Sequence, residues 1–393
     1  MTATSTSSDL FYDPYERSTA LDPHPLLARM REEAPIYHNE ELGFYAVTRY
    51  DDVERVLVAR EQFISSRGAT LNVLLADMQL PPGTLVMDDP PIHTIYRGLM
   101  SRMFTARRVS GLEDSIRAYC AELLDPLVGT GGFDLVRNLG APVPFKVISL
   151  LVGIPEDDKE FVRGRLESFH TDEITVDEIL GGSVFGDFID WRVEHPSDDI
   201  MTTLMNVDFT DETGTERRLT REELLANINN VTLAGLDTTK RLIGWAGKIL
   251  AEHPEQRRAL VEDPSLIPNA VDELLRYEPP MLQLCRYVAS DAEFHGVTVP
   301  EGSPLLAITT AANRDPAHFE APNHFDVRRT GAHHFSLGFG THYCLGQALA
   351  RLEARVMLEE LLARFPEWDI DEEGAVFTHD DLRGWASLPI VTP

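Results

Sequence analysis

The stretch of sequence that decides the fold is LGFGTHYCLG, from Leu337 to Gly346, and a helical pattern over residues 347–365 follows it directly. Its three glycines allow a tight backbone turn that a residue with a Cβ would strain. We therefore expect Cys344 at the N-terminus of that helix, where backbone N–H groups and the helix dipole stabilise a thiolate. Such a thiolate is a strong single ligand for one iron and favours cleavage of an O–O bond. The loop is typical of a haem site with a sulfur ligand.

Two other interpretations of the cysteines have to be weighed. A lone cysteine is most often a small buried apolar residue, and we apply that interpretation to Cys120 and Cys285. A zinc site is the second alternative, because three histidines lie near Cys344 in the sequence: His333, His334 and His342. Structural zinc usually has paired ligands such as C-x2-C with a second pair, and this sequence contains no such pair. The pattern therefore favours a single-cysteine site over zinc.

The composition is that of a globular protein able to bury a large core. The 393 residues are 43% apolar and 25% charged, which is ordinary for folded proteins. The sequence has no apolar run of about 18 residues and no signal-peptide pattern at its start. The cysteines are few and widely spaced, which agrees with a reducing compartment. We expect a cytoplasmic monomer with one domain over residues 1–393, in which residues 1–20 are flexible.

The formal net charge of −29 argues against two classes of partner. Nucleic acids and anionic membranes are negatively charged, and both would repel a chain this acidic. We therefore expect a protein that binds neither nucleic acid nor a membrane.

The spacing of apolar residues predicts a mainly α protein with a smaller β portion. Helical patterns dominate residues 93–277, and strand-like segments cover residues 43–48, 297–299 and 305–308. Residues 64–91 form a long apolar connection that contains proline and glycine, which is typical of a functional loop.

A long central helix is predicted to begin at Thr220. Thr220 and Glu223 fit a capping box, and apolar residues continue to about residue 250. At about 1.5 Å per residue the helix would span roughly 45 Å, so it must cross the core. Its middle reads AGLDTT, from Ala234 to Thr239. A mid-helix glycine costs on the order of 1 kcal/mol relative to alanine, and a buried unpaired carboxylate costs more. The presence of both in the middle of this helix therefore needs a physical explanation.

Two interpretations of this mid-helix segment are possible. In the first, a small residue leaves room for a diatomic molecule while Asp237 and Thr238 relay protons in oxygen chemistry. In the second, the threonines bond back to backbone carbonyls around a helix bend. The residues alone do not decide between the two.

Both stretches resemble motifs of the cytochrome P450 family. The cysteine loop matches F-G-x-G-x-H-x-C-x-G at every specified position but one, since Leu337 stands where the family usually has phenylalanine. The middle of the long helix matches A-G-x-D-T-T at every position, which favours the oxygen interpretation. The resemblance implies the P450 fold, with a long central helix crossing the core. It also implies haem b, with Cys344 as the axial thiolate ligand of the iron.

The resemblance assigns roles to further residues. Asp237 and Thr238 would deliver protons during catalysis. Contacts with the haem are implied for seven residues: His93, Arg97, Ala234, Arg286, His342, Cys344 and Gly346. The two arginines and two histidines of this set would bind the two haem propionates, which need charge-assisted donors. Glu273 and Arg276 match the family's E-x-x-R, and Arg329 would complete a structural ion network with them.

The activity implied by the resemblance is that of a haem-thiolate monooxygenase. Such an enzyme inserts one oxygen atom from O2 into a small or medium hydrophobic organic substrate, such as a fatty acid, terpenoid or aromatic compound. Electrons would come from NAD(P)H through a ferredoxin-type donor and its reductase, because the sequence has no flavin or iron-sulfur motif. The arginines that we expect on the docking face of the donor are Arg102, Arg107, Arg108 and Arg351.

Two alternative functions stay open at this point. A peroxygenase of the same fold would not need an acid and an alcohol in the central helix. A haem-thiolate redox or gas sensor would keep Cys344 but would need neither Thr238 nor a substrate pocket. The expected pocket residues are mostly apolar: residues 71–80, Asn230, Leu233, residues 281–284 and residues 385–388.

Overall fold

The structure, a computed structural model, describes residues 10–76, 83–155, 162, 164, 182–331 and 333–393. Helices dominate it, and the predicted class, mainly α with a smaller β portion, is confirmed. The helices are α1 (Arg17–Leu21), α2 (His24–Glu33), α3 (Tyr50–Val58), α4 (Leu71–Leu75), α5 (Ile92–Ser101), α6 (Ala106–Ser110), α7 (Glu113–Leu124), α8 (Pro142–Val152), α11 (Gly182–Glu194), α12 (Ile200–Asn206), α13 (Arg221–Glu252), α14 (Pro254–Glu262), α15 (Ile267–Tyr277), α16 (Thr309–Ala312) and α17 (Gln347–Arg364).

The strands form one five-stranded sheet and several small ones. The large sheet has the order β1-β2-β10-β7-β3, in which β10 runs parallel to β2 and antiparallel to β7. The bounds of the strands are β1 (Ile36–Asn39), β2 (Phe44–Val47), β3 (Phe63–Ile64), β4 (Gly132–Asp134), β5 (Phe209–Thr210), β6 (Glu216–Arg217), β7 (Leu284–Val288), β8 (Ala292–Phe294), β9 (Val297–Val299), β10 (Pro304–Ala307), β11 (Asp369–Ile370), β12 (Val376–His379), β13 (Arg383–Ser387) and β14 (Pro389–Val391). The three predicted strand segments correspond to β2, β9 and β10.

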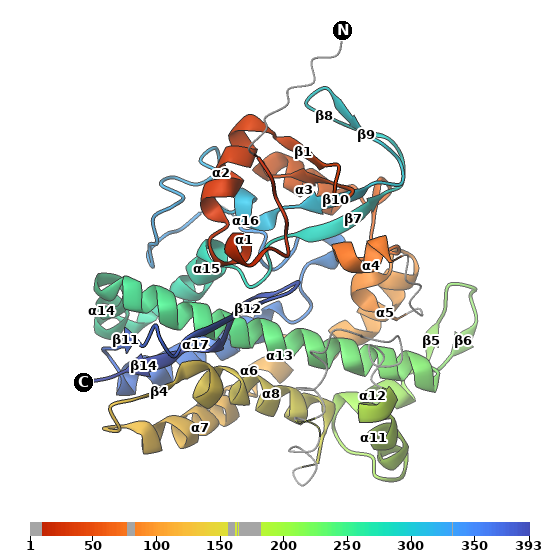
Figure 1. The fold of residues 1–393 in the computed structure, drawn as a ribbon. Coiled ribbons are helices and arrows are strands. Elements are labelled where there is room, and N and C mark those ends of the chain that lie inside the picture. Colours follow the sequence, from red (N-terminus) through yellow and green to blue (C-terminus); the bar gives the residue numbers. More distant parts are fainter. Residues whose placement is uncertain (1–9, 77–82, 156–161, 163, 165–181, 332) are drawn as a thin grey trace.

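The predicted central helix is confirmed as α13, which has 32 residues. Its capping box is complete, because Thr220 Oγ1 accepts from the Glu223 N–H at 3.2 Å and Glu223 Oε2 accepts from the Thr220 N–H at 2.8 Å. Figure 1 shows α13 crossing the molecule, with the five-stranded sheet on one side and α7, α8, α11 and α12 on the other. This helix therefore connects the two halves of the core.

Gly235 allows α8 to approach the middle of α13. A Cβ at Gly235 would lie 2.7 Å from Ile148 Cδ1 of α8, which is closer than van der Waals contact. The helix-propensity cost of this glycine is therefore offset by packing between the two helices. The first interpretation of the motif needs space for a diatomic molecule. Gly235 does not provide that space, because the side chain of Ile148 fills it.

The N-terminal segment contacts distant parts of the chain. Residues 1–9 lie outside the described residues, and within residues 10–20 four residues are buried: Leu10, Tyr12, Pro14 and Ala20. Tyr12 is completely buried, its N–H donates to the Tyr37 hydroxyl at 3.1 Å, and its own hydroxyl donates to Gln283 Oε1 at 2.6 Å. These contacts reach parts of the chain that are distant in sequence, so local polarity did not reveal them.

None of the helices in the described part of the chain is both long enough and apolar enough to cross a membrane.

Candidate active site

The loop before α17 has the geometry that its glycines predict. Gly338 and Gly340 have φ values of 70° and 64°, in the left-handed region that favours glycine. A Cβ at Gly338 would lie 3.1 Å from the carbonyl oxygen of His342. The loop is closed by the Cys344 N–H, which donates to the Leu337 carbonyl at 2.7 Å. Cys344 therefore lies three residues before the first residue of α17.

We expected the helix N-terminus to stabilise a thiolate at Cys344, but the surroundings of the sulfur favour the thiol. Burial raises the pKa of the Cys344 thiol, while a hydrogen bond from the Gly346 N–H and the charges of Arg97 and Arg351 act in the opposite direction. The helix N-terminus alone is thus not sufficient to hold a free thiolate here. A metal ion bound to the sulfur would deprotonate it, because metal ligation requires the thiolate.

The other two cysteines are core residues. Cys120 and Cys285 are 0% and 1% exposed, and burial raises the pKa of each thiol to about 12. The described residues include no group of three His, Cys, Asp or Glu side chains that could hold a metal ion, so the zinc interpretation gains no support. Cys344 is then the cysteine suited to ligation.

Four predicted cationic donors come together near the cysteine loop. His93 and Arg97 lie one turn apart on α5, Arg286 lies in β7, and His342 lies in the loop itself. The rings of His93 and His342 have centroids 4.3 Å apart, and Arg97 Nη2 donates to the Tyr343 carbonyl at 2.5 Å. Three separate elements thus converge on the residues that flank Cys344.

The positive charge of this cluster comes from its two arginines, because both histidines are neutral near pH 7. Burial, followed by the charge of Arg97, lowers the pKa of His93 to about 4, and burial together with Arg286 lowers that of His342 to about 3. Burial also lowers the pKa of Arg286. His93 is 1% exposed, yet neither ring nitrogen has a hydrogen-bond partner within the part of the chain that the structure describes. A buried donor without a partner costs about 1–3 kcal/mol, and a carboxylate at this place would remove that cost.

The middle of α13 combines features of both interpretations of its motif. Thr238 Oγ1 donates to the Ala234 carbonyl at 2.7 Å, the back-bonding geometry of the second interpretation. Leu233 is nevertheless 37% exposed, and Ala234 is exposed beside it, in a helix that otherwise crosses the core. An accessible apolar surface at this position fits a ligand that lies against the helix.

Sequence reasoning missed the ion pairs around Asp237. Its carboxylate pairs with Lys240 and with Arg241, whose Nη2 lies 2.8 Å from Asp237 Oδ2. The spacings of three and four residues are those at which helical side chains meet, so the sequence carried a usable signal.

The expected pocket residues are only partly accessible. Residues 77–80 lie outside the described residues. Trp385 and Leu388 are 6% and 0% exposed, and the Trp385 ring packs edge-on against Trp245 at 5.8 Å between centroids. We therefore assign these two residues to the core and not to the pocket.

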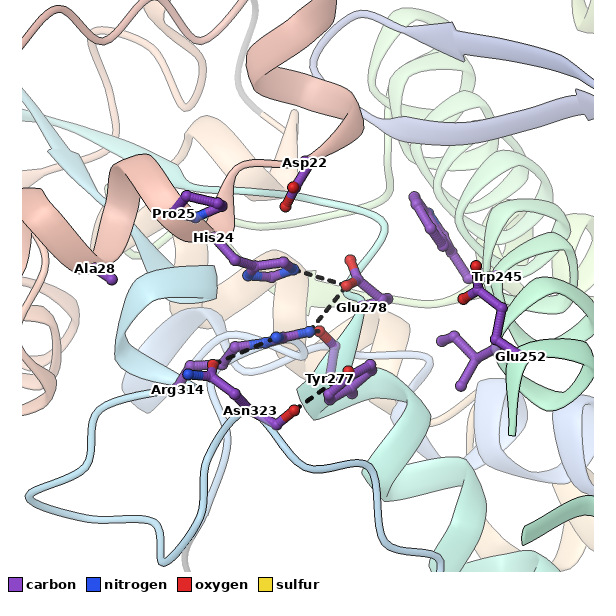
Figure 2. Close-up of a pocket in the computed structure, with 11 residues that line it drawn as sticks. Asp22, His24, Pro25, Ala28, Trp245, Glu252, Tyr277, Glu278, Arg314 and Asn323 are labelled. Carbon is purple, nitrogen blue, oxygen red and sulfur yellow. Dashed lines mark hydrogen bonds and ion pairs between the residues drawn. The ribbon is translucent and has the colours of Figure 1, made fainter. Parts of the chain in front are cut away.

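A separate cleft of about 400 Å³ lies between α2, α13 and α15 (Figure 2). Glu278 in this cleft accepts hydrogen bonds from His24 Nε2 at 2.7 Å and from Arg314 Nη2 at 2.9 Å. None of the predicted site residues lines this cleft. Its lining consists of Asp22, His24, Pro25, Ala28, Trp245, Ile249, Glu252, Tyr277, Glu278, Arg314 and Asn323. The paired charges indicate a structural junction between the N-terminal segment and α15.

The helical fold and the cysteine loop with its buried donors together define the class, which is that of haem proteins with a cysteine ligand. Comparisons with known proteins identify the family within that class. The sequence profile of the family Cytochrome P450 matches residues 188–389. A protein of Mycobacterium tuberculosis named putative cytochrome P450 123 is 33% identical over 395 residues, covering 97% of each chain.

Two further comparisons agree. The vitamin D(3) 25-hydroxylase of Pseudonocardia autotrophica is 34% identical over 94% of this chain and 93% of its own length. The solved structure of CYP105P1 in complex with filipin I has a TM-score of 0.86 at 30% identity, over 98% of this chain and 99% of that one. The chain belongs to the cytochrome P450 family, in its bacterial branch, and it is a haem monooxygenase.

Proposed function

We propose that this P450 inserts one oxygen atom from O2 into a hydrophobic organic substrate, with electrons that reach it from NAD(P)H through a ferredoxin-type donor. The observation that carries the proposal is the convergence of His93, Arg97, Arg286 and His342 around the loop of Cys344. The whole chain would act as one domain.

Haem b fits the residues of the site. The sulfur of Cys344 would bind the iron. The guanidinium groups of Arg97 and Arg286 and the ring N–H groups of His93 and His342 would bind the two propionates, and the His93 ring has no other partner among the described residues. Gly346 leaves open space beside the loop, since a Cβ there would meet nothing within 4 Å. Ala234 exposes a small side chain on α13. When bound, the haem would activate dioxygen, and the dioxygen would supply the oxidising equivalents.

Asp237 and Thr238 would take part in proton transfer. The hydroxyl of Thr238 donates to the Ala234 carbonyl, so its oxygen can accept a hydrogen bond from a water or a ligand that lies against the helix. Asp237 is 17% exposed, and its two cationic partners keep its carboxylate ionised, so it would accept a proton from water.

A hydrophobic substrate is supported by two observations. Leu233 exposes apolar surface in the middle of α13. One similar protein is named vitamin D(3) 25-hydroxylase, and the structure of another, CYP105P1, was solved in complex with filipin I. Fatty acids, terpenoids and aromatic compounds all belong to the class that such a surface would accept.

The electron donor would approach a basic area on an acidic protein. Arg102 and Arg107 are exposed and form no ion pair among the described residues, so their charges are available. Arg108 and Arg351 instead pair with Asp198 at 3.4 Å and Asp272 at 2.9 Å. An acidic ferredoxin is therefore expected to meet the first two.

The alternative functions are less well supported. A peroxygenase takes its oxygen from hydrogen peroxide and would have no use for Asp237 and Thr238 in the central helix. A sensor would have no use for the accessible apolar surface at Leu233.

Thr238→Ala tests the monooxygenase assignment. The substitution should leave folding and haem binding unchanged, because it removes one hydroxyl that bonds its own helix. Proton delivery should suffer, since acid–base groups contribute about 10²–10⁴-fold to the step that they serve. Product per NAD(P)H should fall steeply while NAD(P)H use continues and hydrogen peroxide accumulates.

The measurement needs a reconstituted system with a ferredoxin, its reductase and a binding substrate. Fatty acids, terpenoids and aromatic compounds are screened first for a blue shift of the Soret band, and the compound with the largest shift is then turned over. Product and hydrogen peroxide are measured together. Unchanged coupling in Thr238→Ala would remove the role assigned to Thr238.

A further inference from the structure

Arg241 joins the central helix to the C-terminal hairpin formed by β12 and β13. Its side chain is 2% exposed. Its Nε and Nη2 donate to Asp237 Oδ2 at 3.0 and 2.8 Å. Toward the hairpin, Nη2 donates to Asp380 Oδ2 at 3.2 Å and Nη1 donates to the Thr378 carbonyl at 3.3 Å. One buried guanidinium therefore binds two carboxylates, one on each element.

The hairpin is shaped to receive this arginine. A Cβ at Gly384 of β13 would lie 3.0 Å from Arg241 Cβ and 3.3 Å from its Cγ and Cδ. Gly384 is paired with Thr378 in the hairpin, so the close approach and the Thr378 carbonyl contact occur at the same pair of residues. A larger residue at Gly384 would displace the arginine from its partners.

The charges around Asp237 keep it ionised. Lys240 pairs with Asp237 Oδ1, so that both carboxylate oxygens have a cationic partner. Burial raises the pKa of Asp237, but Arg241 and Lys240 outweigh it and bring the pKa below its usual value. Across the interface, Asp380 is the carboxylate that faces the same guanidinium. A carboxylate in this setting is rarely protonated near neutral pH, which limits its use as a proton donor.

We propose that Arg241 is a positioning residue that holds Asp237 in place against the C-terminal hairpin, and that Asp380 weakens this hold by sharing the guanidinium. The proposal rests on the proposed role of Asp237 in proton delivery. Because two carboxylates compete for one guanidinium, removal of either one strengthens the interaction of the other. The hairpin thereby controls how readily Asp237 gives up and takes up a proton.

The share of electrons released as hydrogen peroxide measures proton delivery without a substrate. Reduction of O2 to hydrogen peroxide uses two electrons and two protons, whereas its reduction to water uses four of each. Holoenzyme with NADPH, a ferredoxin and its reductase should release more peroxide as the pH rises, because the protonated fraction of Asp237 falls. We take the midpoint of this rise as the readout.

Two substitutions should move the midpoint in opposite directions. In Arg241→Gln, Asp237 loses one of two cations, and the midpoint should rise by about one pH unit. In Asp380→Asn, Arg241 binds Asp237 alone, and the midpoint should fall below that of the wild type. The Asp380 side chain is 54% exposed, so this second test does not depend on changing a buried residue.

Two further variants serve as controls. Arg241→Lys keeps the positive charge and should return the midpoint toward the wild-type value. Lys248→Gln changes a cation on the same helix that pairs with Glu252 at 2.9 Å and Glu372 at 2.7 Å, and it should leave the midpoint unchanged.

Asp237→Asn, measured in parallel, separates the proposed role of Asp237 from that of Arg241. If the pH dependence survives in Asp237→Asn, the proposed role of Asp237 is wrong and the role of Arg241 falls with it. If Asp237→Asn removes the pH dependence but Arg241→Gln and Asp380→Asn do not shift the midpoint, the role of Arg241 alone is overturned. A higher peroxide share at every pH in Arg241→Gln would likewise show that the arginine is merely structural.

Discussion

Replacing Cys344 with serine should abolish turnover. The hydroxyl of serine is a far weaker ligand for iron than a thiolate, and it lacks the electron donation that favours cleavage of the O–O bond. The loop itself should keep its fold, because its closing hydrogen bond uses the backbone N–H of residue 344. Turnover is measured as product formed in the reconstituted system, at equal concentrations of folded protein.

The other two cysteines are matched controls for this experiment. Cys120→Ala and Cys285→Ala remove buried thiols of similar size, and burial raises the pKa of both far above neutrality. Both variants should keep wild-type turnover per haem. Turnover that survives in Cys344→Ser, or disappears in one of these controls, would place the ligand elsewhere.

Replacing Glu273 with alanine should destabilise the protein by about 3–5 kcal/mol, the usual cost of removing one partner from a buried ion pair. Glu273 and Arg276 are 3% and 2% exposed, and Arg276 Nε and Nη2 donate to the two carboxylate oxygens at 2.7 and 2.8 Å. Arg329 Nε adds a third contact at 3.1 Å. Without the carboxylate, two guanidinium groups would keep their charge and lose their counterion. Urea unfolding of wild type and variant in one buffer gives the difference.

The exposed pair of Arg29 and Glu33 provides the control for this second prediction. Arg29 Nε lies 2.9 Å from Glu33 Oε1, but the two side chains are 47% and 43% exposed, so water screens the interaction. Glu33→Ala should leave the unfolding curve unchanged. Equal stability of Glu273→Ala and wild type would show that the network including Arg329 is not structural.

Features carried by local sequence patterns were predictable. The capping box at Thr220 and the apolar pattern after it located α13, since both depend on residues a few positions apart. The glycines around Cys344 located the turn before α17 because their φ values are a local property. The pair of Glu273 and Arg276 was placed by the resemblance and by the spacing of three residues on one helix.

Features that depend on contacts between distant segments were not predictable. Nothing near Tyr12 in the sequence indicates that its hydroxyl bonds Gln283, 271 residues away. The burial of the Cys344 sulfur depends on how several elements surround the loop, so the direction of its pKa shift did not follow from the helix N-terminus alone. In the same way, Asp380 reaches Arg241 only because the hairpin folds back against α13.

The most direct test of the central claim is the optical spectrum of the reduced, carbon-monoxide-bound protein. The account predicts the red-shifted Soret band that marks a thiolate opposite carbon monoxide, in the wild type and in Cys120→Ala and Cys285→Ala, and its loss in Cys344→Ser. A Soret band typical of a histidine-ligated haem in the wild type, or an unchanged band in Cys344→Ser, would contradict the assignment of Cys344 as the iron ligand.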